Sequence, residues 1–148
     1  MDANEKRALE DIEKYGCHIL HVLEDETHPR FSYSIGIEKR HSQPELIVTG
    51  LKNDLAASVI NEYCTRVQSG EVFHSNELYS GFIEGFDVTF KVVEKKYYRE
   101  YFGWGIWLYK GEDFRVLQLL FPSTAGIWPW EDNAPSDYTW FLPKLYAT

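Results

Sequence analysis

Hydrophobic residues recur at helical spacing in two segments of the first half of the chain. Near the start, Leu9 and Ile12 fall on one stripe among charged residues, which predicts an amphipathic helix that ends at Gly16. A second helix is predicted over 53–69, begun by an Asn-Asp pair and followed by a glycine. Its apolar stripe consists of Leu55, Val59, Ile60, Tyr63 and Val67.

Alternation of apolar and polar residues predicts strands elsewhere. The clearest case is 31–37, where four large residues share one face and two serines and a glycine share the other. Such a small-residue face lets a backbone, a side chain or a ligand approach closely. Shorter patterns predict further strands over 17–23, 45–50, 87–94 and 114–121.

The remaining segments have weaker patterns. Residues 38–44 read as a polar loop, and 71–86 stay ambiguous because two glycines interrupt the apolar residues. A short helix is predicted over 95–101, whereas 104–109 fits either a helix or a strand. From 123 onward, prolines alternate with aromatic residues and indicate an irregular arm.

This order of elements predicts one α+β domain over residues 1–148. We expect a mostly antiparallel sheet packed by the N-terminal helix and the central helix, with an irregular aromatic-rich C-terminal arm. Fifteen of the 24 aromatic residues lie between Tyr97 and Tyr146. This last third is therefore either the thickest part of the core or a groove that a ligand fills.

The charge balance narrows the choice of partners. The chain has 15 basic and 23 acidic residues, a net charge of −8. Without a basic patch we expect no nucleic-acid binding, whereas a negative surface steers basic proteins toward it. No apolar run is long enough for a membrane helix, and the polar N-terminus does not resemble a signal peptide. A cytoplasmic protein without membrane contact is expected.

Candidate catalytic and metal-binding groups are sparse. Two histidines, at 18 and 21, would lie on opposite faces of a strand, and the two cysteines, at 17 and 64, have no metal-ligand spacing. We predict buried, reduced thiols, no metal site and no cofactor. The best polar pair is His41 with Glu45, which could transfer protons or could be a solvated loop histidine beside a strand-edge carboxylate.

Aromatic residues provide the candidate binding positions. Tyr101 and Trp104 lie close to two glycines, where bare backbone could line a pocket facing the strand that holds Tyr33. Farther along, Trp130 precedes two acidic residues, a composition typical of an interface anchor beside a charged rim. Filling of the core is the alternative for all these rings. The predicted binding residues are Tyr33, His41, Glu45, Tyr101, Trp104, Trp130, Glu131 and Asp132.

Several short motifs resemble one bacterial family. They are Tyr-Gly-Cys-His at 15–18, the strand at 31–37, Gln-Pro-Glu-Leu at 43–46, Tyr-Phe-Gly-Trp at 101–104 and Pro-Trp at 129–130. Together they resemble domain-of-unknown-function family forty-two sixty-two, which implies a small intracellular domain without an established activity. Members of that family tend to have Trp at position 17 and His at position 43, where this chain has Cys and Gln.

Two functions fit these observations. The first is a non-catalytic acidic protein that binds and neutralises a toxin or another basic protein, as immunity proteins do. The second is a small enzyme or ligand-binding domain with a pocket between the 31–37 strand and the 101–107 segment. A loose similarity of the Ser-x-Gly strand to flavin-binding barrels motivates the second function, and this similarity is an analogy of fold.

Overall fold

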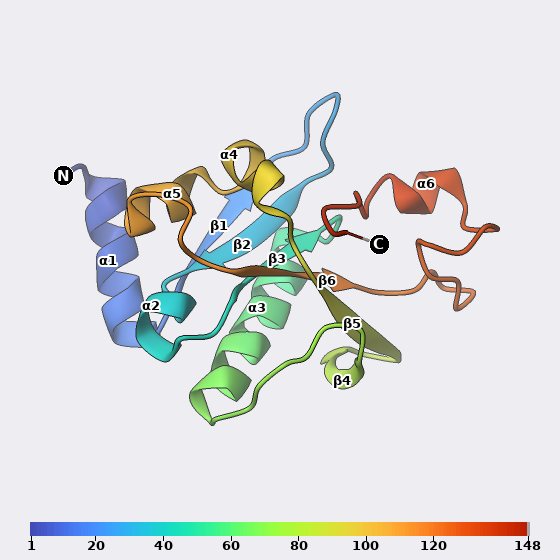
Figure 1. Cartoon of the computed structure of the whole chain (residues 1–148), viewed down its shortest axis with the longest axis horizontal. Coiled ribbons are helices and arrows are strands. Elements are labelled where there is room, and N and C mark those ends of the chain that lie inside the picture. The colour runs from blue at the N-terminus through green and yellow to red at the C-terminus, as the bar shows by residue number, and fades with distance from the viewer. Residues whose placement is uncertain (148) are drawn as a thin grey trace.

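The computed structural model describes residues 1–147 and contains, within them, a six-stranded mixed sheet flanked by helices (Figure 1). The strand order is β1-β2-β3-β6-β5-β4, in which β3 and β6 pair in parallel and all other neighbours are antiparallel. The predicted α+β class with a mostly antiparallel sheet is therefore confirmed. The strands are β1 (His18–Val22), β2 (Phe31–Ile35), β3 (Glu45–Thr49), β4 (Leu78–Ile83), β5 (Phe86–Val92) and β6 (Val116–Leu120).

The helices occupy both faces of the sheet. Both long helices were predicted, and the first ends where Gly16 adopts the left-handed conformation with φ of 92°. The helices are α1 (Ala3–Tyr15), α2 (Ile37–His41), α3 (Asn53–Gln68), the 3₁₀ turn η1 (Lys95–Tyr97), α4 (Tyr98–Tyr101), α5 (Gly103–Tyr109) and α6 (Ser136–Thr139).

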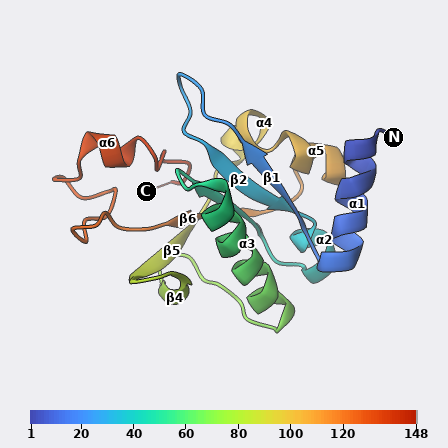
Figure 2. The same ribbon diagram turned by 180° about the vertical axis from the view of Figure 1, so that it is seen from behind.

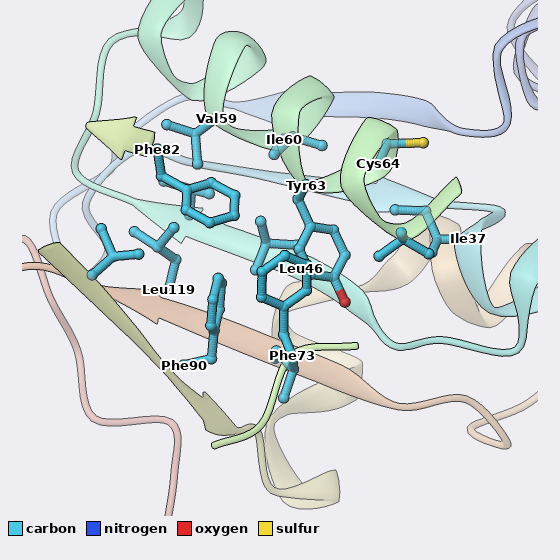
Figure 3. Packing of buried hydrophobic residues seen from close by; sticks show 14 of the residues in the cluster. Ile37, Leu46, Val59, Ile60, Tyr63, Cys64, Phe73, Phe82, Phe90 and Leu119 are labelled. Carbon is cyan, nitrogen blue, oxygen red and sulfur yellow. The ribbon is translucent and has the colours of Figure 1, made fainter. Parts of the chain in front are cut away.

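Helix α3 covers one face of the sheet (Figure 2). Its side chains Val59, Ile60 and Tyr63 pack with Leu46 of β3 and Phe90 of β5 (Figure 3). Such burial of apolar surface is the main favourable contribution to folding. This part of the core therefore joins the central helix to strands that are distant along the chain.

Helices α1, α4 and α5 cover the opposite face (Figure 1). The large residues of β2 point this way: Tyr33 packs edge-on against Phe102, and Phe31 against Tyr101. The small residues Ser32 and Ser34 lie on the other face, toward α3, and are 1% and 0% exposed. The alternation read from the sequence thus separates a bulky face from a face that a helix approaches closely.

The polar loop predicted over 38–44 is partly wrong, because α2 occupies its first half. Strand β2 ends at Ile35, and Gly36 turns the chain with φ of 105°. A side chain at Gly36 would also place its Cβ 2.7 Å from Ile12 of α1. A helix this short has little stability of its own, so its formation depends on the tertiary contacts described below.

The structure also shows the secondary structure of two segments for which the sequence pattern was ambiguous. The ambiguous stretch 71–86 contains β4, an edge strand whose pairing with β5 shifts register between Tyr79 and Ile83. Residues 103–109 form helix α5, whose Trp104, Trp107 and Tyr109 pack against the core cluster that includes Tyr33 of β2. Neither outcome was determined by local periodicity.

Residues 122–143, hereafter the C-terminal arm, leave the end of β6 and project from the body at the end opposite α1 (Figures 1 and 2). Apart from α6 the arm is irregular, as predicted. Thr49 donates its hydroxyl to the Phe141 carbonyl at 2.6 Å, and Gln118 donates Nε2 to the Pro143 carbonyl at 2.8 Å. Gly50 leaves room for Phe141, whose Cβ would lie 2.5 Å from an added Cβ.

Candidate functional site

The most polar position of the interior is Glu45, at the start of β3. Its carboxylate is 1% exposed and accepts the hydroxyl of Ser34 at 2.9 Å and the hydroxyl of Tyr109. It also accepts the backbone N–H groups of residues 36–38 at 3.0–3.2 Å. We call these groups the Glu45 cluster. They hold the start of α2 against the sheet and take the place of a side-chain cap.

The charge state of Glu45 is set by competing effects. Burial raises its pKa to about 7, although the hydrogen bonds from Tyr109, the backbone and Ser34 act in the opposite direction. Outside the cluster, Arg115 makes a bidentate ion pair with Glu38, with N–O distances of 2.7 and 2.8 Å. The hydrogen bond from Arg115 lowers the pKa of Glu38. Arg115 is therefore neutralised by Glu38 and not by Glu45.

The predicted pair of His41 and Glu45 does not form a hydrogen bond. The acceptor positions of Glu45 are taken by the groups of the cluster, and His41 Nε2 is buried without a hydrogen-bond partner among residues 1–147. The proton-transfer role that we considered for this pair therefore has no support from the geometry.

Three other predicted binding residues lie together between β2 and the helices. Tyr33 is 2% exposed and accepts the backbone N–H of Trp104 at 3.0 Å, while Tyr101 is 6% exposed. Burial raises the pKa of both tyrosines to about 12. Trp104 is half-buried beside Trp107. These rings fill the space between the layers, which was the alternative interpretation in the sequence.

The same arrangement does not bring the small residues of β2 together with the 101–107 segment. Ser32 and Ser34 face α3, whereas Tyr101 and Phe102 contact the opposite face of the strand. The period of two in a strand places neighbouring side chains on opposite faces. The space beside the serines is occupied by α3 and by the Glu45 carboxylate.

The remaining predicted residues lie on the C-terminal arm and are open to solvent. Trp130 is 48% exposed, and Glu131 and Asp132 are exposed. Glu131 accepts the backbone N–H of Trp128 at 2.6 Å, which orders the turn. The structure thus separates the predicted residues into a buried group near β2 and an exposed group on the arm.

A groove of about 410 Å³ runs between the arm and the end of the sheet. Its walls are mostly apolar, and Asp137 is its one charged lining residue within the described chain. Phe141, 43% exposed, forms part of one wall, and Phe121 and Tyr138 lie beside it. The groove is lined by Leu51, Ile83, Phe86, Phe121, Pro122, Ser123, Thr124, Asp137, Tyr138 and Phe141.

Lys91 of β5 contacts the other side of the arm. Its ammonium lies 4.8 Å from the ring centre of Trp130 and 5.1 Å from that of Tyr146, and it donates to Asn76 at 2.7 Å. Trp128 stacks on Trp130 with 5.1 Å between ring centres. Cation–π contacts of this kind stabilise exposed sites by roughly 0.5–1 kcal/mol each. The arm is therefore held in one position while several of its rings stay accessible.

Sequence reasoning missed Tyr109, Lys91 and Asp137 as site residues. Tyr109 lies 64 positions from Glu45 along the chain and donates its hydroxyl to it. No local sequence pattern predicts such a contact. Asp137 lay in a segment that we predicted as irregular arm, where its acidity was the available signal.

Within residues 1–147 the other titratable groups form no metal cluster, and the two thiols have pKa values shifted in opposite directions, with the pKa of Cys64 lowered by its hydrogen bond with Cys17. Among residues 1–147, no three His, Cys, Asp or Glu side chains are close enough to hold a metal ion. Cys17 and Cys64 are free and buried. The hydrogen bond to Cys64 and burial raise the pKa of the Cys17 thiol well above its ordinary value, so Cys17 lacks thiolate character.

Comparison with known proteins identifies a family but no characterised relative. A family model described as "Domain of unknown function (DUF4262)" matches residues 11–135. No curated protein and no solved structure matches the chain. Within the described residues, no helix is both long enough and apolar enough to cross a membrane.

Proposed function

The chain belongs to the DUF4262 family, whose function is unknown, and we propose that it is a binding protein that recognises a basic protein through its C-terminal arm. The proposed class is a non-catalytic inhibitor of immunity type, which neutralises a toxin or another basic protein by covering its surface. The observation that supports this most is the combination, on the arm, of exposed rings, an apolar groove and unpaired carboxylates.

The charge distribution of the arm favours a basic partner. Between Pro122 and Pro143 the chain has three acidic residues, Glu131, Asp132 and Asp137, and no lysine or arginine. None of the three makes an ion pair within residues 1–147. Complementary charge at the rim of an interface accelerates association and suppresses wrong partners.

The exposed rings supply the anchors that such an interface needs. Trp130, Trp140 and Phe141 are 43–48% exposed, although large apolar side chains are normally buried. Aromatic residues dominate binding energy at protein interfaces when a partner desolvates them. The groove beside Phe141 fits an apolar side chain of the partner, and Asp137 at its edge fits an adjacent lysine or arginine.

The arm is also preorganised, which reduces the entropy lost on binding. The hydrogen bonds from Thr49 and Gln118 hold its returning segment, and the hydroxyl of Tyr138 donates to the Phe121 carbonyl. Lys91 holds the loop that contains Trp130. A surface held in this way needs little rearrangement when it binds.

The proposal is tested by affinity capture from the source cells with three matched baits: the wild type, Asp132→Lys and Asp113→Lys. Asp113 is exposed and lies outside the arm, and its side chain makes no hydrogen bond within residues 1–147. Each variant replaces one aspartate with lysine, so both change the net charge equally. We expect a basic protein on the wild-type and Asp113→Lys baits, released by salt, and much less of it on Asp132→Lys.

The result is then measured with purified proteins. Association with the captured partner should be slower for Asp132→Lys and should depend less on ionic strength. Equal capture by all three baits would place the contact surface outside the arm. The absence of any basic protein from the wild-type bait would contradict the proposed function itself.

A further inference from the structure

A second cavity, of about 610 Å³, lies on the other side of the arm. It is formed by the loop that contains Trp130, the end of the arm and β5. Its charged lining residues are Lys91 and Lys144, and no carboxylate of the described chain lines it. Its volume is within the range of about 300–1,000 Å³ that is usual for small-molecule sites.

The two lysines are the unusual feature of this cavity. The whole protein has a net charge of −8, yet neither ammonium lies within ion-pair distance of a carboxylate in residues 1–147. Lys91 is held over the rings of Trp130 and Tyr146, and Lys144 lies 5.8 Å from the ring centre of Tyr146. Two positive charges are therefore concentrated around one buried tyrosine ring.

The other walls are apolar and planar. Trp130, which is 48% exposed, lines the cavity, and Leu142 and the two prolines of the lining complete an apolar wall. Thr139 adds a hydroxyl to the lining. Aromatic and apolar walls with a few polar groups are typical of sites that bind a flat organic ligand.

We propose that this cavity binds a small anion that carries a planar ring, with the anionic group between Lys91 and Lys144 and the ring against Trp130. A lysine ammonium binds phosphate or carboxylate as a point charge. The ring is needed because the rest of the lining, which includes Trp130, Leu142 and two prolines, is mainly apolar. A nucleoside monophosphate and an aromatic carboxylate share this chemistry. The proposal does not depend on a protein partner for the arm.

Isothermal titration calorimetry of the purified chain at low ionic strength tests the proposal with four probes: AMP, 2-naphthoate, adenosine and inorganic phosphate. We expect AMP or 2-naphthoate to bind, and the one that binds identifies the anionic group. Adenosine has the ring without the charge, and phosphate has the charge without the ring. Adenosine should bind at least about tenfold more weakly because it lacks the charge that the lysines bind. Phosphate should also bind at least about tenfold more weakly, because it lacks the ring that packs against Trp130.

The variant Lys144→Gln should weaken binding of the active probe about tenfold or more. Lys144 is exposed, so this change should leave the fold intact. Lys39→Gln is the matched control: it removes the same charge from α2, outside the cavity, and should bind as the wild type does. Three outcomes would each overturn the proposal: no binding of either ring-bearing anion at millimolar concentration, adenosine binding as tightly as AMP, or Lys144→Gln binding like the wild type.

Discussion

The Glu45 cluster and the C-terminal arm use polar and aromatic groups in opposite ways. At Glu45 every acceptor meets a donor of the same chain, and the residue is 1% exposed. On the arm, large rings and three carboxylates are left open to solvent while the backbone beneath them is fixed. A satisfied buried network specifies one fold, whereas preorganised open groups are available to a partner. This difference is why we assign an architectural role to the first region and propose recognition for the second.

The largest effect is expected when the Glu45 acceptor is removed. Glu45→Leu introduces an apolar side chain of similar size and leaves the backbone N–H groups of 36–38 and two hydroxyls without an acceptor. Since an unsatisfied buried group costs about 1–3 kcal/mol, we expect a loss of at least about 3 kcal/mol in the free energy of unfolding. Urea denaturation measures it. Glu10→Leu, on the exposed side of α1, is the control and should change stability by less than about 0.5 kcal/mol.

The pH dependence of stability also tests the role of Glu45. The pKa of Glu45 is raised from 4.5 to about 7 in the folded protein, so the folded state binds more protons than the unfolded state between these values. Its contribution to stability is therefore complete below pH 4.5 and is lost as the pH rises through 7. We expect Glu45→Gln to be most destabilising near pH 4.5, and the difference from wild type to shrink toward pH 8. Urea titrations across this range measure the difference, and a constant difference would refute the raised pKa.

A smaller loss of stability is expected when the contacts between Lys91 and the arm are removed. Lys91→Met keeps the length of the side chain but removes the cation–π contacts to Trp130 and Tyr146 and the bond to Asn76. We expect a loss of about 1–2 kcal/mol. Hydrogen exchange should become faster in the arm around Trp130, with α3 unchanged. Lys39→Met should leave both regions unaffected, and a global acceleration in Lys91→Met would mean that the arm is part of the cooperative core.

The smallest effect on stability is expected when an exposed carboxylate of the arm is replaced. Asp132→Lys removes a side chain for which the structure shows no hydrogen bond or ion pair within residues 1–147, so thermal unfolding should shift by the equivalent of less than about 0.5 kcal/mol. The same change should slow binding of a basic partner. A large loss of stability in this variant would assign the arm a structural role instead.

The sequence predicted the regular parts of the fold well because local periodicity reports which face of an element is buried. The alternation in 31–37 correctly separated the bulky face of β2 from its small-residue face. The same pattern overran the strand by two residues, since the contact between Gly36 and Ile12 and the acceptor Glu45 decide where it turns. These are contacts between distant segments, and periodicity does not report them.

The candidate site was harder to predict for a related reason. The identity of an aromatic residue does not show whether its ring is buried in the core, as in Tyr33 and Tyr101, or exposed, as in Trp130. The acidic pair after Trp130 was the useful signal, because charges next to a ring disfavour burial of that stretch. The groove beside Phe141 joins Leu51, Ile83 and Phe86 to the arm, and its existence could be learned only from the fold.

The most direct test of the account is the hydrogen-exchange footprint of a captured basic partner on the wild-type chain. We predict that amides of the arm, and those next to the groove around Leu51 and Ile83, become protected in the complex, while the segment around Glu45 exchanges as in the free protein. Protection of α1, α2 and β1 with an unchanged arm would contradict the assignment of recognition to the C-terminal arm.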